Sequence, residues 1–269
     1  MRPALVGRRV ALLALIAAMV APFVVMLLTA LKPDAEIATH PLLPAHWAWE
    51  NLLIPWRDRL PQLFRNSLVL ALGTTLLNLM IALPAAYALA RLPVVGKKTW
   101  RQVLIATQMF SPVVVVVSLY RLAAVAHLTD SLLGLIVVNT AYSLAFAIWL
   151  LTAYLSKVPA EIEEAALVDG CSRLGALWRV LLPVAKPGIV TTTTFVFIGA
   201  WNEFVIALTF LSSSHNKPLT VGLFDYASAY NPQWNLLMAA ALWAIVPVIL
   251  LFAFIEKHLA EGLTAGAVK

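Results

Sequence analysis

Few residues of this chain have the types and spacing that catalysis or cofactor binding requires. The sequence has no Gly-x4-Gly-Lys-Ser/Thr loop that would bind nucleotide phosphates. Its five histidines are scattered, and no pair has metal-ligand spacing on one helix face. A nucleophile elbow of the Gly-x-Ser-x-Gly type is also missing. The sequence therefore predicts a protein that is not an enzyme, with no catalytic residue, no metal site and no cofactor of its own.

One acidic side chain within an apolar stretch is the strongest candidate for moving a proton or another ion. Glu203 follows Trp201 and Asn202, and a carboxylate inside a membrane is costly unless it is paired or functional. The other polar candidates of the apolar stretches are uncharged, namely Asn78, Gln108, Ser111, Asn139 and Asn202. Together with Glu203 they are candidates for a translocation path, although hydrogen bonding between helices is the favoured explanation of each uncharged group taken alone.

The composition identifies the chain as a membrane protein. It is 62% hydrophobic and 12% charged over 269 residues, whereas about a quarter of a soluble domain is charged. The net charge of +6 comes from bases near span ends, where lipid headgroups attract them, so it does not indicate a nucleic-acid partner. Cys171 is the only cysteine, which excludes an internal disulfide.

The apolar runs predict an all-α polytopic membrane protein with six transmembrane helices in one domain over residues 1–269. Bases without acids gather in the first nine residues and in residues 91–101, so the positive-inside rule places both termini in the cytoplasm. The Trp-rich residues 32–65 and the polar residues 212–235 are then external loops. The predicted spans are 10–31, 67–90, 103–120, 131–155, 188–211 and 236–255.

Residues 156–187 form the longest polar interruption in the second half of the chain, and the charge rule places them in the cytoplasm. Glu161, Glu163 and Glu164 follow Pro159, as in the first turn of a helix, where the helix dipole favours acids. A short helix of acids and small residues suits a groove on a soluble protein. It suits the negatively charged inner lipid surface less well.

Gly170 is expected to end this first helix, and Ser172 to cap a second one. The apolar residues of the second helix recur at helical spacing and predict one face, which we expect to pack beneath this chain's own spans. These residues are Leu174, Leu177, Trp178 and Leu181.

The same segment resembles the EAA loop of the inner-membrane permeases of ABC importers, EAA-x3-G-x9-I-x-LP. Glu164-Ala165-Ala166, Gly170 and Leu182-Pro183 match it, and Val180 stands where Ile is usual. Further matches resemble the carbohydrate-uptake permeases, and within them the smaller maltose-type subunit. These matches, which extend the resemblance over nearly the whole chain, are Asn66-Ser67, Trp201-Asn202-Glu203-Phe204 and the tail 262–269.

The resemblance implies a permease subunit that forms, with a second homologous permease, the path for a sugar or sugar-like solute. It implies two ATPase subunits that hold ATP and Mg, an extracytoplasmic solute-binding protein, and the inner membrane of a bacterial or archaeal cell. In the maltose system the sugar site lies mainly on the partner permease.

Three sets of residues receive roles from this resemblance. By position, the residues that couple to the ATPase are Glu163, Glu164, Ala165, Ala166, Asp169 and Gly170. The tail residues that reach the ATPase subunits are Gly262, Thr264, Gly266 and Lys269. The loop residues that face the binding protein are Lys217, Asp225 and Tyr226.

Two other classes of function stay open at this point. Glu203 also suits a self-sufficient carrier driven by an ion gradient. The docking loop also suits a membrane anchor that transports nothing and recruits a soluble enzyme. The sequence does not name a substrate, although the absence of a basic cluster within the spans argues weakly against a phosphorylated one.

Overall fold

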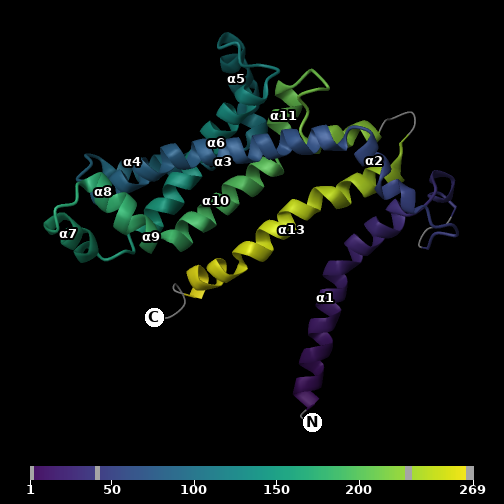
Figure 1. The fold of residues 1–269 in the computed structure, drawn as a ribbon, viewed down its shortest axis with the longest axis horizontal. Coiled ribbons are helices and arrows are strands. Elements are labelled where there is room, and N and C mark those ends of the chain that lie inside the picture. The colour runs from purple at the N-terminus through teal and green to yellow at the C-terminus, as the bar shows by residue number, and fades with distance from the viewer. Residues whose placement is uncertain (1–2, 40–42, 228–231, 265–269) are drawn as a thin grey trace. The chain divides into compact units, whose positions relative to one another are not determined.

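The computed structural model describes residues 3–39, 43–227 and 232–264 (Figure 1). Within these ranges the secondary structure is helical and contains no strand, which confirms the predicted all-α class. The elements are α1 (Pro3–Ala30), η1 (Asp34–Glu36), η2 (Trp49–Leu52), α2 (Ile54–Arg57), α3 (Leu60–Arg91), α4 (Lys97–Thr107), α5 (Pro112–Val125), α6 (Leu132–Leu155), α7 (Ala160–Val168), α8 (Arg173–Ala176), η3 (Leu177–Leu181), α9 (Leu182–Val184), α10 (Lys186–Trp201), α11 (Val205–Phe210), α12 (Leu219–Gly222), η4 (Leu223–Ala227) and α13 (Trp234–Thr264).

Among the described residues, four helices are long and apolar enough to cross a membrane singly. They are residues Gly7–Ala30 of α1, all of α3 and α6, and Trp234–Ile255 of α13. Two bent pairs raise the number to at most six: α4 with α5, at 101°, and Arg173–Val184 with α10, at 82°. A multi-pass membrane protein is thus confirmed, and the count of six spans stays a prediction.

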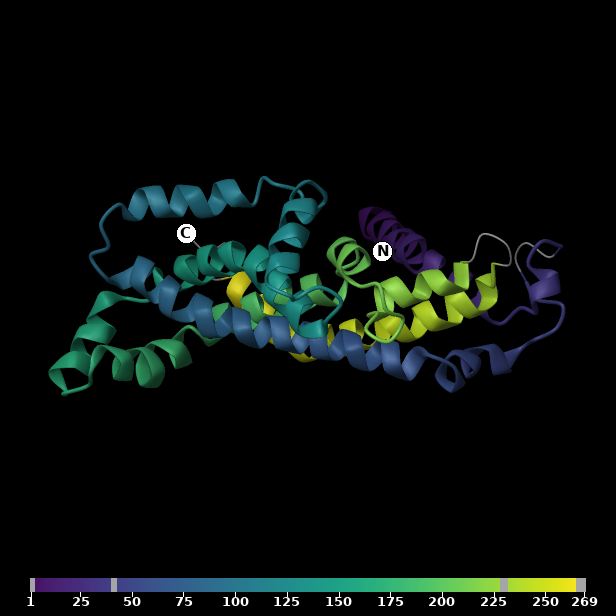
Figure 2. The same cartoon turned by 90° about the horizontal axis from the view of Figure 1, so that it is seen from above.

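The predicted third span, 103–120, is wrong as a single helix, because α4 ends at Thr107 and α5 begins at Pro112 (Figure 2). Proline has no N–H to donate and disfavours a helical backbone in the residue before it. Ser111 is accordingly extended, with φ −65° and ψ 143°. The predicted fifth span, 188–211, is also interrupted, since α10 ends at Trp201 and α11 begins at Val205.

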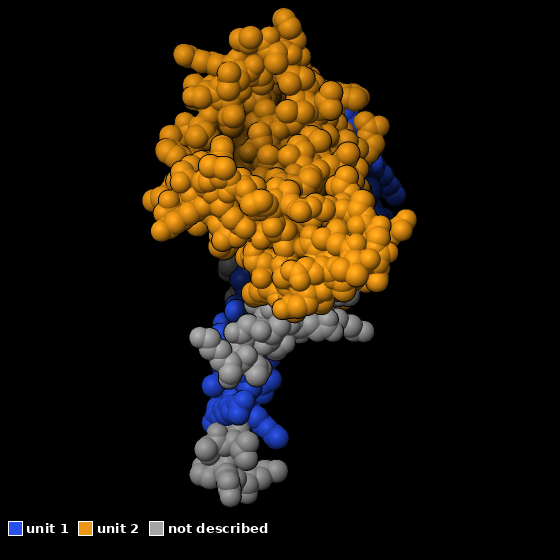
Figure 3. Space-filling view, turned by 90° about the vertical axis from the view of Figure 1, so that its left-hand side faces the viewer, with its two compact units in different colours: residues 1–64, 222–246 blue, residues 65–221, 247–269 orange. Residues whose placement is uncertain are grey.

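The described chain groups into two compact units, which Figure 3 colours separately. The first consists of residues 1–64 and 222–246, and the second of residues 65–221 and 247–269. One transmembrane domain over the whole chain stays a prediction. In the first unit the Trp-rich segment is ordered by its own contacts: the Asn51 amide donates to the carbonyls of Ala30 and Lys32, and the Trp243 indole donates to Leu52.

The second unit has two apolar clusters, which pack its helices together and leave the candidate site between them. One cluster joins the second halves of α3 and α6 to the segment that follows α7, and contains Tyr87, Leu151 and Leu181. The other joins α5, the first half of α6 and α11, and contains Leu135, Ile206 and Phe210. Figure 1 shows α7, α8 and α9 at one end of α6 and α10, and α5 and α11 toward the other end.

Candidate translocation pocket and coupling helix

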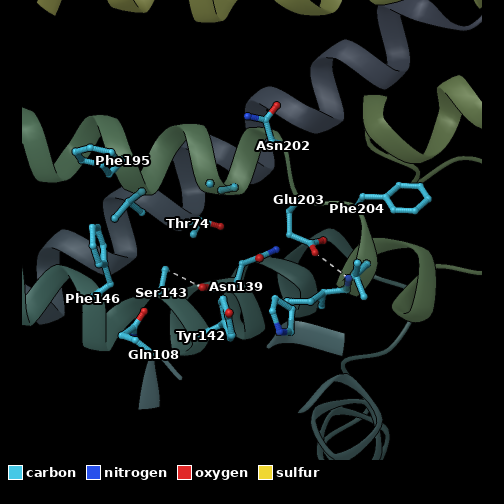
Figure 4. A pocket seen from close by; sticks show the side chains of 16 residues that line it. Thr74, Gln108, Asn139, Tyr142, Ser143, Phe146, Phe195, Asn202, Glu203 and Phe204 are labelled. Atoms are coloured by element: carbon cyan, nitrogen blue, oxygen red, sulfur yellow. Dashed lines mark hydrogen bonds between the residues drawn. The ribbon is translucent and has the colours of Figure 1, made fainter. Parts of the chain in front are cut away.

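A pocket of about 380 Å³ lies in the second unit, where the breaks of two helices face α3 and α6 (Figure 4). The α4–α5 break contributes Gln108, and the α10–α11 break contributes Asn202 and Glu203. Unwound backbone at the middle of broken membrane helices is tolerated where it lines a cavity, and such breaks mark substrate sites in transporters. The remaining polar lining comes from Thr74 of α3 and from Asn139, Tyr142 and Ser143 of α6.

Two buried polar atoms of this pocket have no hydrogen-bond partner among the described residues. They are Nδ2 of Asn139 and Oγ1 of Thr74, and both side chains are at least nine-tenths buried. A buried donor left unpaired is costly, so a ligand with hydroxyl groups would gain by binding it. Phe146 and Phe195 meet edge to face at one end, with ring centroids 5.9 Å apart, and supply an apolar wall.

The structure brings together four of the six predicted path residues, namely Gln108, Asn139, Asn202 and Glu203. Asn78 lies behind the lining, where its Nδ2 donates to Ser143 Oγ at 2.9 Å. Ser111 is not among the lining residues. Figure 4 also shows the Asn202 amide directed away from the other polar side chains.

Sequence reasoning missed three polar lining residues, Thr74, Tyr142 and Ser143. A signal for them was present. Thr74 precedes Asn78 by one helical turn, and Tyr142 and Ser143 follow Asn139 at three and four residues, so each group shares one helix face. A hydroxyl group is a weak signal, because it can satisfy itself within a helix, as Thr75 does by donating to the carbonyl of Ala71.

The Glu203 carboxylate caps the short helix α11. Its two oxygens accept from the backbone N–H groups of Ile206 and Ala207, each at 2.8 Å. A carboxylate at a helix start satisfies free N–H groups and is stabilised by the helix dipole. The charge of Glu203 therefore has a structural explanation. An acidic residue at this position no longer argues for a carrier driven by an ion gradient.

The predicted docking helix is α7, and its ends form as the sequence indicates. Gly170 adopts φ +85°, a left-handed conformation that favours glycine. Cys171 N then donates to Ala166 O at 3.0 Å, and Gly170 N donates to Leu167 O at 3.1 Å, the paired bonds of a Schellman motif. Ser172 Oγ accepts from Gly175 N at 3.1 Å, which confirms the second predicted cap.

The residues of the EAA motif divide between two faces of α7. Glu164, Ala165, Asp169 and Gly170 are exposed, whereas Glu163 and Ala166 are buried. The Glu163 carboxylate accepts a hydrogen bond from Tyr87 Oη at 2.5 Å and lies 3.4 Å from Arg91 Nε. Glu163 thus has its partners on α3 of its own chain, whereas the exposed residues remain available to another protein.

The predicted apolar face of the second helix is half wrong. Leu177 and Leu181 are buried, but Leu174 and Trp178 are 64% and 61% exposed. Leu174 and Trp178 lie four residues apart, as do Leu177 and Leu181, so the predicted face divides into one exposed and one buried row. Leu177–Leu181 form a π-helical turn. The fully buried Ala176 lies beside Leu177 on the buried side of the segment.

The basic connection after α3 closes the end of that helix. Lys97 Nζ donates to Ala90 O at 3.1 Å, and Arg101 Nη2 donates to Leu89 O at 3.3 Å. Arg91 donates to the carbonyl of Val158, just before α7. Bases at a helix C-terminus satisfy its free carbonyls and complement its dipole. These side chains therefore stabilise the end of α3, and their location in the cytoplasm stays a prediction.

The Asn66-Ser67 pair anchors the start of the loop that the resemblance directs toward a binding protein. The Asn66 amide donates to His215 O at 2.8 Å and to Lys217 O at 3.0 Å. Ser67 Oγ accepts from Leu219 N at 2.7 Å. Both side chains are buried, so this motif orders the loop that contains Lys217.

The other two predicted loop residues, Asp225 and Tyr226, belong to the first unit. Asp225 pairs with Arg59 at 3.2 Å. Tyr226 is buried and its hydroxyl donates to Asp58, also at 3.2 Å. Burial, together with the nearby Asp58 carboxylate, raises the pKa of Tyr226 to about 12. Its hydroxyl therefore serves its own unit, and contact with a binding protein stays a prediction for all three residues.

The predicted tail is partly helical, since α13 continues through Gly262 to Thr264. Gly266 and Lys269 lie outside the described residues. Contact of these four residues with an ATPase stays a prediction.

Residues 6–264 match the family described as binding-protein-dependent transport system inner membrane component. The chain belongs to this family. The permease is 35% identical to the inner membrane ABC transporter permease protein YcjP of Escherichia coli K12, over 92% of this chain and 90% of that one. It is 32% identical to the diacetylchitobiose uptake system permease protein DasC of Streptomyces coelicolor, over 100% of both chains.

The fold is also that of a solved permease. A chain from a bacterial ABC transporter that imports the acidic polysaccharide alginate superposes with a TM-score of 0.82 at 22% identity, covering 94% of this permease and 95% of that chain. Family membership establishes a permease subunit of an ABC importer in the inner membrane. It confirms that the chain is not an enzyme and that ATP hydrolysis belongs to separate subunits, and it disfavours a self-sufficient carrier.

Proposed function

We propose that this permease forms, with a second homologous permease, the path of a neutral sugar or sugar-like solute. The pocket supports this proposal because its lining is polar, mostly uncharged and partly aromatic, with buried donors free to bind hydroxyl groups. The one carboxylate of the lining, Glu203, is already bound by backbone N–H groups. Relatives named for diacetylchitobiose uptake and for trehalose/maltose transport agree with this class of solute.

The proposal includes three kinds of partner. Two ATPase subunits, which hold ATP and Mg, dock on the exposed residues of α7, and the tail after α13 reaches between them. An extracytoplasmic solute-binding protein delivers the solute to the loop of residues 212–235. Both termini then lie in the cytoplasm, and this chain binds no cofactor itself.

Uptake by the assembled complex tests this function. The permease is co-expressed with its partner permease and ATPase and reconstituted in liposomes with ATP enclosed and the solute-binding protein outside. It is then screened with radiolabelled neutral disaccharides and with sugar phosphates. We expect uptake of a neutral sugar that depends on ATP. A pH or sodium gradient that drove uptake by this chain alone would contradict the proposal, and so would an assembled complex that transports only phosphorylated sugars.

A variant pair tests the docking face. Glu164→Lys reverses an exposed charge of α7 and is expected to lower recovery of the ATPase with the permease. Lys157→Glu, an exposed reversal just before α7, is the matched control. Equal recovery with both variants would exclude α7 as the docking element.

A further inference from the structure

Two buried side chains and one partly buried side chain connect the coupling helix α7 to α3. Tyr87 and Arg91 lie one turn apart on the last part of α3, and Glu163 lies in the first turn of α7. The Tyr87 hydroxyl donates to Glu163 at 2.5 Å, and the Arg91 guanidinium lies 3.4 Å from the other carboxylate oxygen. Tyr87 and Glu163 are 5% and 7% exposed. We call these three residues the α3–α7 latch.

The latch also holds the chain that leads into α7. Arg91 donates to the carbonyl of Val158, which comes just before the Pro159 cap. Val158 and Tyr87 belong to the apolar cluster that also contains Leu177 and Leu181 of the segment after α7. The residues just before α7 and just after it therefore belong to the same apolar cluster as Tyr87 of α3.

The latch resists separation of the two helices more than apolar contact alone would. Apolar contacts have no preferred direction and allow helices to slide, whereas a hydrogen bond weakens steeply when its angle changes. Removing either charge from the buried pair would leave the other charge without compensation in a site of low dielectric. A force on α7 is therefore expected to move α3 before it breaks the latch.

The same helix α3 lines the pocket. Thr74 is part of the pocket wall, and Asn78 donates to Ser143 in that wall. Thr74 lies about 20 Å along the helix from Tyr87, at 1.5 Å rise per residue. Pro84 lies between the two residues, and α3 nevertheless runs without a break from Leu60 to Arg91, so displacement at the latch is expected to reach the pocket.

We propose that the α3–α7 latch makes the coupling helix and α3 move as one body, and that α3 passes the movement of α7 to the pocket. Glu163 is then a positioning residue and does not contact the ATPase. This inference rests on the proposed function, because it assumes that an ATPase moves α7. It separates Glu163 from its exposed neighbour Glu164, which serves docking.

The test measures how nucleotide changes access to the pocket. In the purified complex, Cys171→Ser removes the one cysteine of this chain and Gly199→Cys places a thiol in the pocket lining, where an added Cβ meets no atom within 4 Å. The labelling rate by a polar maleimide is compared between the nucleotide-free complex and the complex trapped with ATP and vanadate. The readout is the ratio of the two rates, and ATPase recovery is measured on the same samples.

Glu163→Gln and Tyr87→Phe keep the side-chain shapes and remove the charge or the hydroxyl. We expect each to retain the ATPase and to lower the ratio toward unity by about fivefold or more, the lower limit of typical coupling between sites. The charge reversal Arg91→Glu with Glu163→Arg restores an opposite-charge pair and is expected to recover part of the ratio. Glu164→Gln is the contrasting variant, expected to lower ATPase recovery and to leave the ratio of the assembled fraction unchanged.

Three outcomes overturn the inference. An unchanged ratio in Glu163→Gln shows that the latch does not carry the movement. Loss of the ATPase in Glu163→Gln, without recovery in the double reversal, shows that Glu163 is itself a docking residue. If the parent complex recovers no ATPase at all, the proposed function fails, and the inference fails with it.

Discussion

The latch and the pocket treat buried polar groups in opposite ways. At the latch, the Glu163 carboxylate is shared between Tyr87 and Arg91. In the pocket, Asn139 Nδ2 and Thr74 Oγ1 are buried with no hydrogen-bond partner in the described chain. In the first arrangement the carboxylate has one hydrogen bond, from Tyr87, and an ion pair with Arg91, whose Nε makes no hydrogen bond to the described residues, so separating the helices would break that bond and leave a charge uncompensated. The second arrangement has polar atoms that are free to form hydrogen bonds, and a solute could bind to them reversibly.

In the functions proposed above, this difference separates the residues that transmit movement from the residues that bind the solute. Glu203 is instructive because it lies in the pocket lining and yet resembles the latch, with both carboxylate oxygens occupied. Its charge orders α11, and in the proposed function the neutral side chains bind the solute. A charged residue within a span is thus explained by its bonds, which its depth alone does not reveal.

The largest expected effect breaks the latch. Arg91→Met leaves the Glu163 charge buried with Tyr87 alone, and breaking a buried pair typically costs about 3–5 kcal/mol. We expect a marked fall in the thermal unfolding temperature of the purified permease. Arg179→Met, which removes an exposed base, is the control and should change stability by no more than about 0.5 kcal/mol. If the two variants lowered the unfolding temperature equally, the Arg91–Glu163 pair would contribute no more to stability than an exposed base does.

The next effect compares a glycine of the coupling segment with a glycine of the pocket. Gly170→Ala forces a Cβ into the left-handed conformation and should cost about 1–2 kcal/mol. Gly170→Asn should cost less, since Asn tolerates this conformation. Gly199→Ala, in helix α10 with open space around its Cβ, should be neutral or slightly stabilising. Unfolding measurements in detergent check this order.

A third prediction concerns the unpaired amide of the pocket. Asn139→Leu removes a buried donor without a partner, which itself costs about 1–3 kcal/mol, so stability should be unchanged or higher. Solute uptake by the complex should fall. Asn78→Leu is the matched control, because it breaks the bond to Ser143 and should lower stability. If Asn139→Leu destabilised the permease as Asn78→Leu does, the Asn139 amide would already have a hydrogen-bond partner and would not be free to bind a solute.

The smallest effect concerns Asp130, a carboxylate with one oxygen that accepts three hydrogen bonds. Its Oδ1 accepts from Ser212 N, Ser213 N and Ser213 Oγ, each at 3.0 Å. The Ser213 backbone N–H in particular lowers the pKa of Asp130 below its ordinary 3.8. A lowered folded-state pKa stabilises the fold fully above the unfolded value, and this gain is lost as pH falls through the lowered value.

The change Asp130→Asn should therefore reduce stability slightly at neutral pH and remove part of the loss in acid. Unfolding temperatures measured from neutral pH to below 3.8 test this, with Asp34→Asn at an exposed site as the control. The same acid dependence in Asp130→Asn as in the parent would contradict the assignment.

Local features of this permease were readable from single residues and short spacings. Gly170 and Ser172 end and begin helices as predicted, because a cap depends on backbone within a few residues of itself. The apolar runs predicted a helical membrane protein, because backbone groups in lipid must bond within their own segment. The EAA spacing likewise led to the family that the comparisons establish.

The breaks within the spans and the buried faces of the helices were harder to predict from the sequence, even where a local signal existed. Pro112 signals the α4–α5 break, but a run long enough to cross a bilayer masked it. The exposed Leu174 and Trp178 were misassigned because apolar spacing predicts a stripe along a helix but does not show which edge of that stripe is buried.

By itself, then, the sequence determined the class, the membrane setting, the family and the caps of the coupling segment. Only the tertiary structure decided that Glu163 turns inward to Tyr87 while Glu164 stays exposed, that Glu203 caps α11, and that Thr74 meets Asn139 at a pocket. Helix period alone does not orient α7, because the side that faces inward depends on where α3 ends. Partners such as Tyr87 and Glu163 are 76 residues apart, and no local pattern encodes which distant group a buried charge will meet.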